Sequence, residues 1–108
     1  MEIGSAVLKD RKHLSATGMV VAVILLDRHS GDIIQGPELF TKGFLTMEDA
    51  DEILEDAKDA LQSHLSELDS NVKKDDASMQ DEIRLALRRF FRTRIDRRPV
   101  VIPIVMEV

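Results

Sequence analysis

The chain contains no cysteine, tryptophan or tyrosine, and its only aromatic side chains are four phenylalanines. The absence of cysteine excludes a disulfide framework and any thiolate zinc site, which fits a reducing, cytoplasmic location. Few aromatic rings leave few platforms for base stacking, a main source of affinity for single-stranded nucleic acid. The longest purely apolar run, Met19 to Leu26, is far shorter than the ~20 residues of a membrane helix, so we expect a soluble protein without a membrane partner.

Side chains that could support catalysis are also sparse. His13, His29 and His64 have no second ligand at a recognised metal spacing. The acidic residues around Glu55 have the spacing of a solvated helix face, and the glycines are too few for a phosphate-binding loop. No serine or threonine stands beside a base in a recognisable nucleophile motif. We therefore predict no catalytic residue, no metal ligand and no cofactor in this chain.

Charge is distributed unevenly along the 108 residues. Residues 48–82 hold thirteen acidic side chains against three basic ones, whereas residues 83–98 hold seven arginines against one acid, Asp96. The net charge of −5 therefore hides a strong separation of charge. Two interpretations stay open: the acidic and basic segments pair with each other inside the fold, or the arginines remain free to attract nucleic-acid phosphates.

The first half of the chain predicts β-structure. The run Met19 to Leu26 is rich in Val and Ile and has the length of a buried strand. Residues 27–32 supply turn residues, so residues 33–35 are expected to return antiparallel. Gly36-Pro37 interrupts this ladder, and residues 39–45 form either a bulged continuation or a third short strand.

The second half predicts two helices. Thr46 followed by Asp49 resembles a capping box, and apolar residues then recur at helical spacing as far as Leu68. A polar connection follows. Ser78 with Asp81 offers a second cap, which precedes the arginine-rich helix. We expect the arginines near the end of that helix to complement the helix dipole.

The tail Val100 to Val108 is a second apolar strand candidate, because Pro99 ends the preceding helix. Pro103 cannot donate to a ladder, so this strand should lie at an edge or turn that position outward. The predicted fold class is α+β, with a small three-stranded sheet and two main helices packed on one face. Residues 1–17 are assigned to a lead-in segment and residues 18–108 to the domain.

Both principal strands are apolar on both of their faces, whereas two helices can cover only one face of a small sheet. The other face should prefer a partner, since a large exposed apolar patch marks an interface. The alternative is that residues 1–17 and 36–45 fold over it. Which alternation of side chains points outward is left open, and the candidate interface residues are Val21, Val23, Leu25, Val101, Ile102 and Ile104.

Two stretches, taken together, resemble a known family. Residues 2–14, followed by Gly18 and the Val-rich strand, are similar to the segment that leads from the catalytic body of ribonuclease J into its C-terminal domain. Residues 83–91 and 97–108, with their Arg-Arg-Pro step, resemble the end of that domain. Smaller matches lie in the intervening strands, at Gly36-Pro37 and Lys42-Gly43-Phe44.

The resemblance implies a specific context. Ribonuclease J enzymes are cytoplasmic RNA-degrading proteins of the metallo-β-lactamase and β-CASP type, zinc-dependent exoribonucleases (5′ to 3′) and endoribonucleases. They hold two zinc ions with a His-x-His-x-Asp-His motif, which is missing from this sequence. None of the family's catalytic residues can therefore be transferred to this chain. The resemblance implies a detached C-terminal domain, of a kind associated with subunit assembly and with support of RNA degradation.

We accordingly predict a non-catalytic assembly or accessory domain of a ribonuclease J. The expected partner is another copy, in a homodimer or homotetramer formed through the sheet face, or the parent catalytic domain, with RNA reached through the parent. A stand-alone RNA-binding module that uses the arginine-rich helix is the alternative, and a small independent nuclease is a third hypothesis. The candidate RNA contacts are Arg88, Arg89, Arg92, Arg97 and Arg98.

Overall fold

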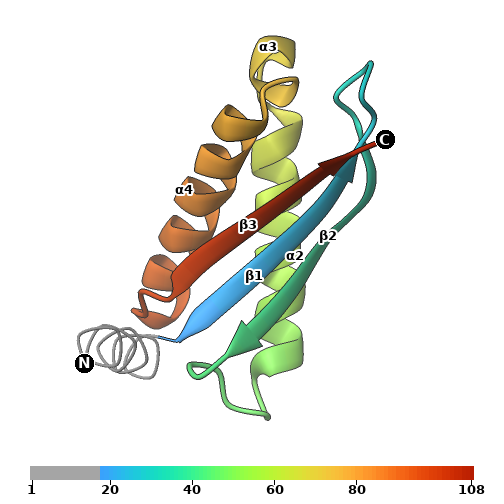
Figure 1. Cartoon of the computed structure of the whole chain (residues 1–108). Coiled ribbons are helices and arrows are strands. Elements are labelled where there is room, and N and C mark those ends of the chain that lie inside the picture. The colour runs from blue at the N-terminus through green and yellow to red at the C-terminus, as the bar shows by residue number, and fades with distance from the viewer. Residues whose placement is uncertain (1–17) are drawn as a thin grey trace, which may run out of the picture.

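The computed structural model describes residues 18–108, so the predicted lead-in at residues 1–17 lies outside the described residues. One three-stranded sheet packs against two long helices that share one of its faces (Figure 1). The predicted α+β class is confirmed. In chain order the elements are β1 (Met19–Leu26), β2 (Ile33–Lys42), α2 (Ala50–Ser66), α3 (Ser70–Lys73), α4 (Asp76–Ile95) and β3 (Val100–Glu107).

The sheet has the order β2-β1-β3, with β1 antiparallel to β2 and parallel to β3. Strand β2 runs through Gly36-Pro37, and two register shifts against β1 absorb the interruption. The bulged continuation is therefore the correct alternative for the segment after Pro37. Gly36 adopts φ +98°, and a Cβ there would lie 2.7 Å from the Val23 carbonyl oxygen, so this bulge requires glycine.

Strand β3 lies at an edge of the sheet, as Pro103 predicts. The Val100 N–H donates to the Gly18 carbonyl (2.9 Å) and the Val108 N–H donates to the Leu26 carbonyl (3.0 Å). Because N–H groups alternate sides along a strand, the nitrogen of Pro103 faces away from β1. The missing N–H of Pro103 therefore removes no hydrogen bond between β1 and β3. On the free edge of β3, its absence disfavours pairing with another strand.

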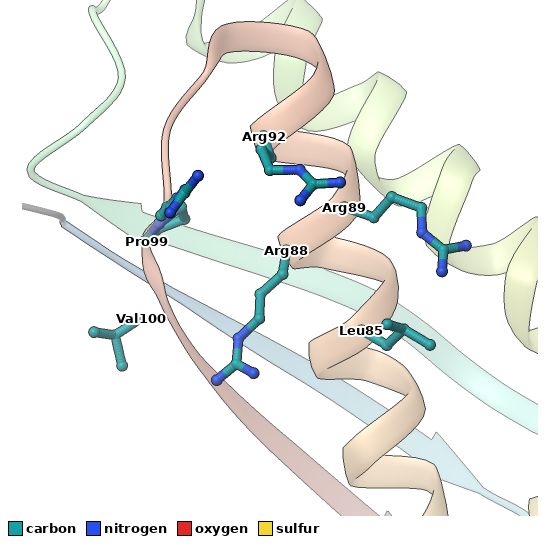
Figure 2. A pocket seen from close by; sticks show the side chains of 7 residues that line it. Leu85, Arg88, Arg89, Arg92, Pro99 and Val100 are labelled. Atoms are coloured by element: carbon teal, nitrogen blue, oxygen red, sulfur yellow. The ribbon is translucent and has the colours of Figure 1, made fainter.

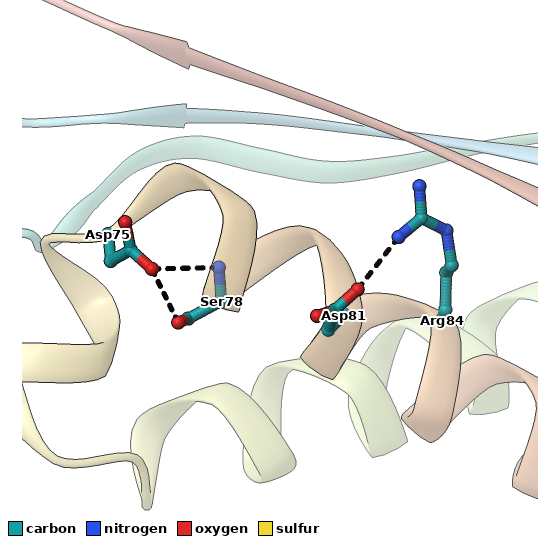
Figure 3. Close-up of polar contacts among 4 residues, drawn as sticks. All are labelled: Asp75, Ser78, Asp81 and Arg84. Carbon is teal, nitrogen blue, oxygen red and sulfur yellow. Dashed lines mark hydrogen bonds and ion pairs between the residues drawn. The ribbon is translucent and has the colours of Figure 1, made fainter.

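Both helix starts differ from the predicted caps. Helix α2 begins at Ala50 with Asp49 as its N-cap, and the Thr46 hydroxyl only donates to the Asp49 carboxylate (3.2 Å). Helix α4 begins one turn before the predicted Ser78 cap. There the Asp75 carboxylate accepts from the backbone N–H of Ser78 (3.2 Å) and from its hydroxyl (2.5 Å) (Figure 3). The predicted partner of Ser78, Asp81, instead accepts from Arg84 (2.9 Å).

The core lies between the sheet and the two long helices. Alternate residues of β1 point into it, from Val20 to Leu26, and each is at most 1% exposed. Phe91 of α4 is fully buried, and its ring packs edge-on against Phe44 (centroids 5.0 Å apart) and Phe90 (5.2 Å). The helices contribute further buried side chains, namely Ile53, Ala57, Leu61, Leu65, Met79, Ile83, Ala86 and Leu87.

Candidate interaction surfaces

The sheet face that points away from the helices is apolar along β1 and β3. The side chains of β1 that alternate with the core residues are half-buried, and no element of residues 18–108 crosses them in Figure 1. We call this surface the open sheet face. Its apolar members are Met19, Val21, Val23 and Leu25 of β1, Phe40 of β2, and Ile102, Ile104 and Met106 of β3.

The strand register arranges these side chains in rows. Val21 lies between Phe40 on β2 and Ile102 on β3. In the next row, Val23 has Glu38 on one side and Ile104 on the other. Paired residues of neighbouring strands share a face, so the apolar centre covers β1 and β3 while β2 adds a partly polar border. An apolar centre with a polar rim is the usual anatomy of a protein interface.

The structure brings five of the six candidate interface residues together: Val21, Val23, Leu25, Ile102 and Ile104. The sixth candidate, Val101, does not lie on this face: it is only 5% exposed and belongs to the core under the helices. The hydrophobic pattern could not separate Val101 from Ile102, because both phases of this strand are apolar.

Two residues of the open sheet face were missed by the sequence reasoning: Phe40, which is 61% exposed, and Met106, which is 48% exposed. Phe40 shares its face of β2 with two charged residues, Glu38 and Lys42, and the bulge in β2 conceals this phase in the sequence. Met106 follows Ile102 and Ile104 at a spacing of two, and that spacing was the available signal.

A second surface feature lies where the C-terminal half of α4 meets the start of β3. It is a cleft of about 510 Å³, and we call it the arginine cleft (Figure 2). Arg88 and Arg92 extend from consecutive turns of α4, on the side where the chain passes Pro99 and enters β3. Among residues 18–108, no acidic side chain lines it. The lining residues are Leu85, Arg88, Arg89, Arg92, Arg98, Pro99 and Val100.

The structure divides the seven arginines into two groups. Arg94 pairs with Asp56 of α2 (2.7 Å) and lies near Glu52 (3.8 Å), and Arg84 pairs with Asp81 (2.9 Å). Internal pairing of the acidic and basic segments therefore holds for these two. Within residues 18–108 the remaining five form no ion pair; four of them line the arginine cleft, and Arg97 is exposed outside it.

The described part of the chain offers no metal centre. Residues 18–108 contain no group of three or more His, Cys, Asp or Glu side chains placed to hold an ion. His64 of α2 instead contacts Glu82 of α4, with 2.6 Å between the ring nitrogen and the carboxylate oxygen. His29 is exposed in a turn, and His13 lies outside the described residues. The residues present do not fit a zinc pair. In the same part of the chain, no helix is long and apolar enough to cross a membrane.

Two carboxyl groups at the end of the sheet remote from the arginine cleft have shifted pKa values. The backbone N–H groups of Ser30 and His29 donate to Asp27 and lower its pKa below the ordinary 3.8. A hydrogen bond and like-charge repulsion from Asp76 raise the pKa of Glu107. The hydrogen bonds to Asp27 fix the turn between β1 and β2. Neither Asp27 nor Glu107 lies in the arginine cleft.

The structure defines a small α+β domain that exposes an apolar sheet face and an arginine cleft and that has, within residues 18–108, no group of side chains placed to hold a metal ion. Comparison with known proteins gives its family. Residues 6–108 match the family model described as the ribonuclease J C-terminal domain. The chain is 32% identical over 107 residues to ribonuclease J2 of Bacillus subtilis strain 168, covering 99% of this chain. It is 33% identical over 108 residues to ribonuclease J 1 of Streptococcus pyogenes serotype M3, covering 97% of this chain.

The chain belongs to the ribonuclease J C-terminal domain family, as the sequence resemblance indicates. Ribonuclease J 2 of Staphylococcus aureus strain NCTC 8325 is a further relative, 30% identical over 111 residues. In all three relatives the matched region is 19% of the protein, so the chain spans about a fifth of their length.

Proposed function

We propose that this chain is a non-catalytic assembly and accessory domain of a ribonuclease J, and that it supports RNA processing and degradation by associating subunits through the open sheet face. The observation that carries the proposal is the exposed apolar surface over β1 and β3, where Ile102, Ile104 and Met106 are each more than a third exposed. The largest contiguous apolar patch on a typical monomer covers about 300–600 Å² and is often functional, and the open sheet face falls in that range.

The size of this surface sets the expected strength of association. Three strands about 4.8 Å apart and eight residues long present a plane of roughly 14 by 26 Å, or about 370 Å². A standard stable interface buries about 800 Å² on each partner. The open sheet face alone should therefore support a weak, concentration-dependent association, and a stronger one when other parts of a longer protein contribute.

We assign the partner on this face to a second copy of the domain. Two apolar sheets pack face to face about 10 Å apart, and each sheet supplies the cover that the other lacks. The result is a four-layered assembly with the helices outside. The β2 border carries charges of both signs, Glu38 and Lys42, which a two-fold partner can match with its own copies of the same residues.

The test is sedimentation velocity over a range from micromolar to millimolar protein. The variant Ile104→Glu places a charge in the middle of the open sheet face, and Met47→Glu is the matched control. Met47 is 96% exposed and lies in the loop before α2, and its substitution likewise replaces an apolar side chain with a carboxylate. Far-UV circular dichroism confirms that both variants fold.

We expect the average mass of the unaltered chain and of Met47→Glu to rise with concentration, while Ile104→Glu stays monomeric. A burial cost of several kcal/mol for an unpaired charge is larger than a weak interface can supply. A chain that is monomeric throughout, or an association that Ile104→Glu leaves intact, contradicts the proposed role of this face.

The remaining functions of the longer protein follow the family. We propose that the parent is a cytoplasmic, zinc-dependent ribonuclease whose metal site and nuclease centre lie outside this chain. Incubation of the isolated chain with RNA and zinc or manganese should then release no cleavage product above buffer. Cleavage that survives purification and follows the chain through chromatography would contradict this assignment.

A second candidate function has its own supporting observation. Four arginines of the arginine cleft form no ion pair within the described part of the chain, which favours contact with RNA phosphates. This contact is compatible with assembly, because the two surfaces differ in chemistry and meet only where Val100 of the cleft pairs with Met19 of the open sheet face.

A further inference from the structure

We propose that the arginine cleft is a binding site for the phosphodiester backbone of single-stranded RNA, read without sequence preference. The inference rests on the proposed function, since an RNA-degrading parent supplies the strand. It goes further by naming the site, the chemical group that is recognised and the form of the RNA.

The first argument is the availability of the guanidinium groups. Arg84 and Arg94 lie on the same helix as the cleft arginines, but their charges are taken up by Asp81 and Asp56 at 2.9 and 2.7 Å. Arg88 and Arg92 have no such partner among residues 18–108, and both are exposed. A guanidinium presents several N–H donors in one plane, which match the oxygens of a phosphate, so free arginines in a group favour a polyanionic ligand.

The second argument is the placement of these charges. On the α2 side of α4, Arg94 engages Glu52 and Asp56, whereas the cleft opens beside β3 and is lined by no acid of residues 18–108. A phosphate that enters the cleft therefore meets cations directly, although the whole chain carries a net charge of −5. The cleft arginines locally overcome the repulsion from the net negative charge, because exposed charges farther away than about 8 Å are largely screened at physiological salt.

The shape of the cleft favours a single strand over a duplex. A volume of about 510 Å³ is that of a recess, and the apolar residues in its lining, Leu85, Pro99 and Val100, can contact a sugar or a base edge. An A-form duplex is recognised across wide, shallow minor grooves that span many base pairs, which a recess of this size does not match.

The absence of aromatic rings in the cleft excludes one mode of recognition. Phe44, Phe90 and Phe91 pack together in and beside the core, and Phe40 lies on the open sheet face. Base stacking on aromatic side chains therefore contributes nothing in the cleft, and affinity must come from the phosphates. Binding should depend steeply on salt and little on base identity.

The salt dependence gives a number to test. If four arginines each neutralise one phosphate of a single strand, the logarithm of the binding constant falls with the logarithm of salt with a slope of about −2.8. Raising salt from about 50 to about 200 mM should then weaken binding about 50-fold. Removing two of the four charges should reduce the slope to about −1.4 and the loss to about 7-fold.

The experiment uses the 108-residue chain and fluorescence anisotropy with short labelled oligouridylate and oligoadenylate. The test variant is Arg88→Gln with Arg92→Gln, and the control is Arg84→Gln with Arg94→Gln. Both double variants remove two positive charges from α4, but only the first removes unpaired ones. Circular dichroism and sedimentation of all proteins show whether folding and association are retained.

We expect the two oligonucleotides to bind with equal affinity. The RNA affinity of the test variant should fall at least tenfold at low salt, whereas that of the control should stay within about threefold of the unaltered chain. Equal losses of RNA affinity in both double variants, or no loss in the test variant, would refute the proposed RNA site. The test variant could instead be monomeric and keep its RNA affinity. That result would mean that the cleft receives the acidic α2 of a second copy, and it would refute the RNA site. RNA binding by a chain that remains monomeric would refute the assembly role alone.

Discussion

The two faces of the sheet should respond very differently to the same substitution. Ile24 of β1 is fully buried under the helices, whereas Ile104 of β3, which pairs with the preceding residue Val23, points to the opposite face and is 40% exposed. Truncation of a buried isoleucine to alanine costs about 2–5 kcal/mol, because apolar contact is lost and a cavity remains. We expect about 3 kcal/mol for Ile24→Ala, which lowers the melting temperature by about 12–24 °C.

Ile104→Ala should cost only about 1 kcal/mol, since this side chain is partly hydrated already and its removal leaves no enclosed cavity. The assay is urea unfolding followed by far-UV circular dichroism at a protein concentration low enough to keep the chain monomeric. At high concentration the cost of Ile104→Ala should grow, because the second copy then stabilises the folded state. Equal costs for the two variants at low concentration would refute the assignment of the faces.

Two further predictions concern local structure. Asp75→Ala should destabilise the chain by about 0.5–2 kcal/mol through loss of the N-cap of α4, whereas Asp81→Ala should change its stability by less than about 0.5 kcal/mol; urea unfolding measures both, and the reverse order would support the cap at Ser78. Because hydrogen bonds lower the pKa of Asp27, its carboxylate contributes stability above the unfolded value of 3.8 and loses it as pH falls through the lower folded pKa. Asp27→Ala should therefore destabilise the chain at pH 7, and the difference from the unaltered chain should vanish at strongly acidic pH; a difference that persists there would contradict the role of the ionised carboxylate.

The strands were the most predictable part of the fold. Met19 to Leu26 has the composition and length of a buried strand, and Pro103 correctly places the last strand at an edge. The direction of its side chains was not predictable. Val101 and Ile102 are equally apolar, and the register of β3 against β1, which pairs Val101 with the buried Val20, fixes which of them faces the helices.

The caps and the arginines show a second limit. Thr46, Asp49, Asp75 and Ser78 are all good capping residues, and the backbone conformation at Asp75 decides which one caps α4. The sequence likewise shows seven arginines in residues 83–98 without showing which of them meet an acid. That depends on how α2 packs against α4, which brings Asp56 to Arg94, while no acid of residues 18–108 lines the arginine cleft.

The central claim, that the open sheet face docks a second copy, is tested most directly by methyl NMR spectra recorded over a dilution series. The account predicts that concentration shifts the methyl signals of Val21, Val23 and Ile104, while those of Val20 and Ile24, on the covered side of the same sheet, stay in place. Shifts confined to other surfaces, or spectra that do not change up to millimolar protein, would contradict it.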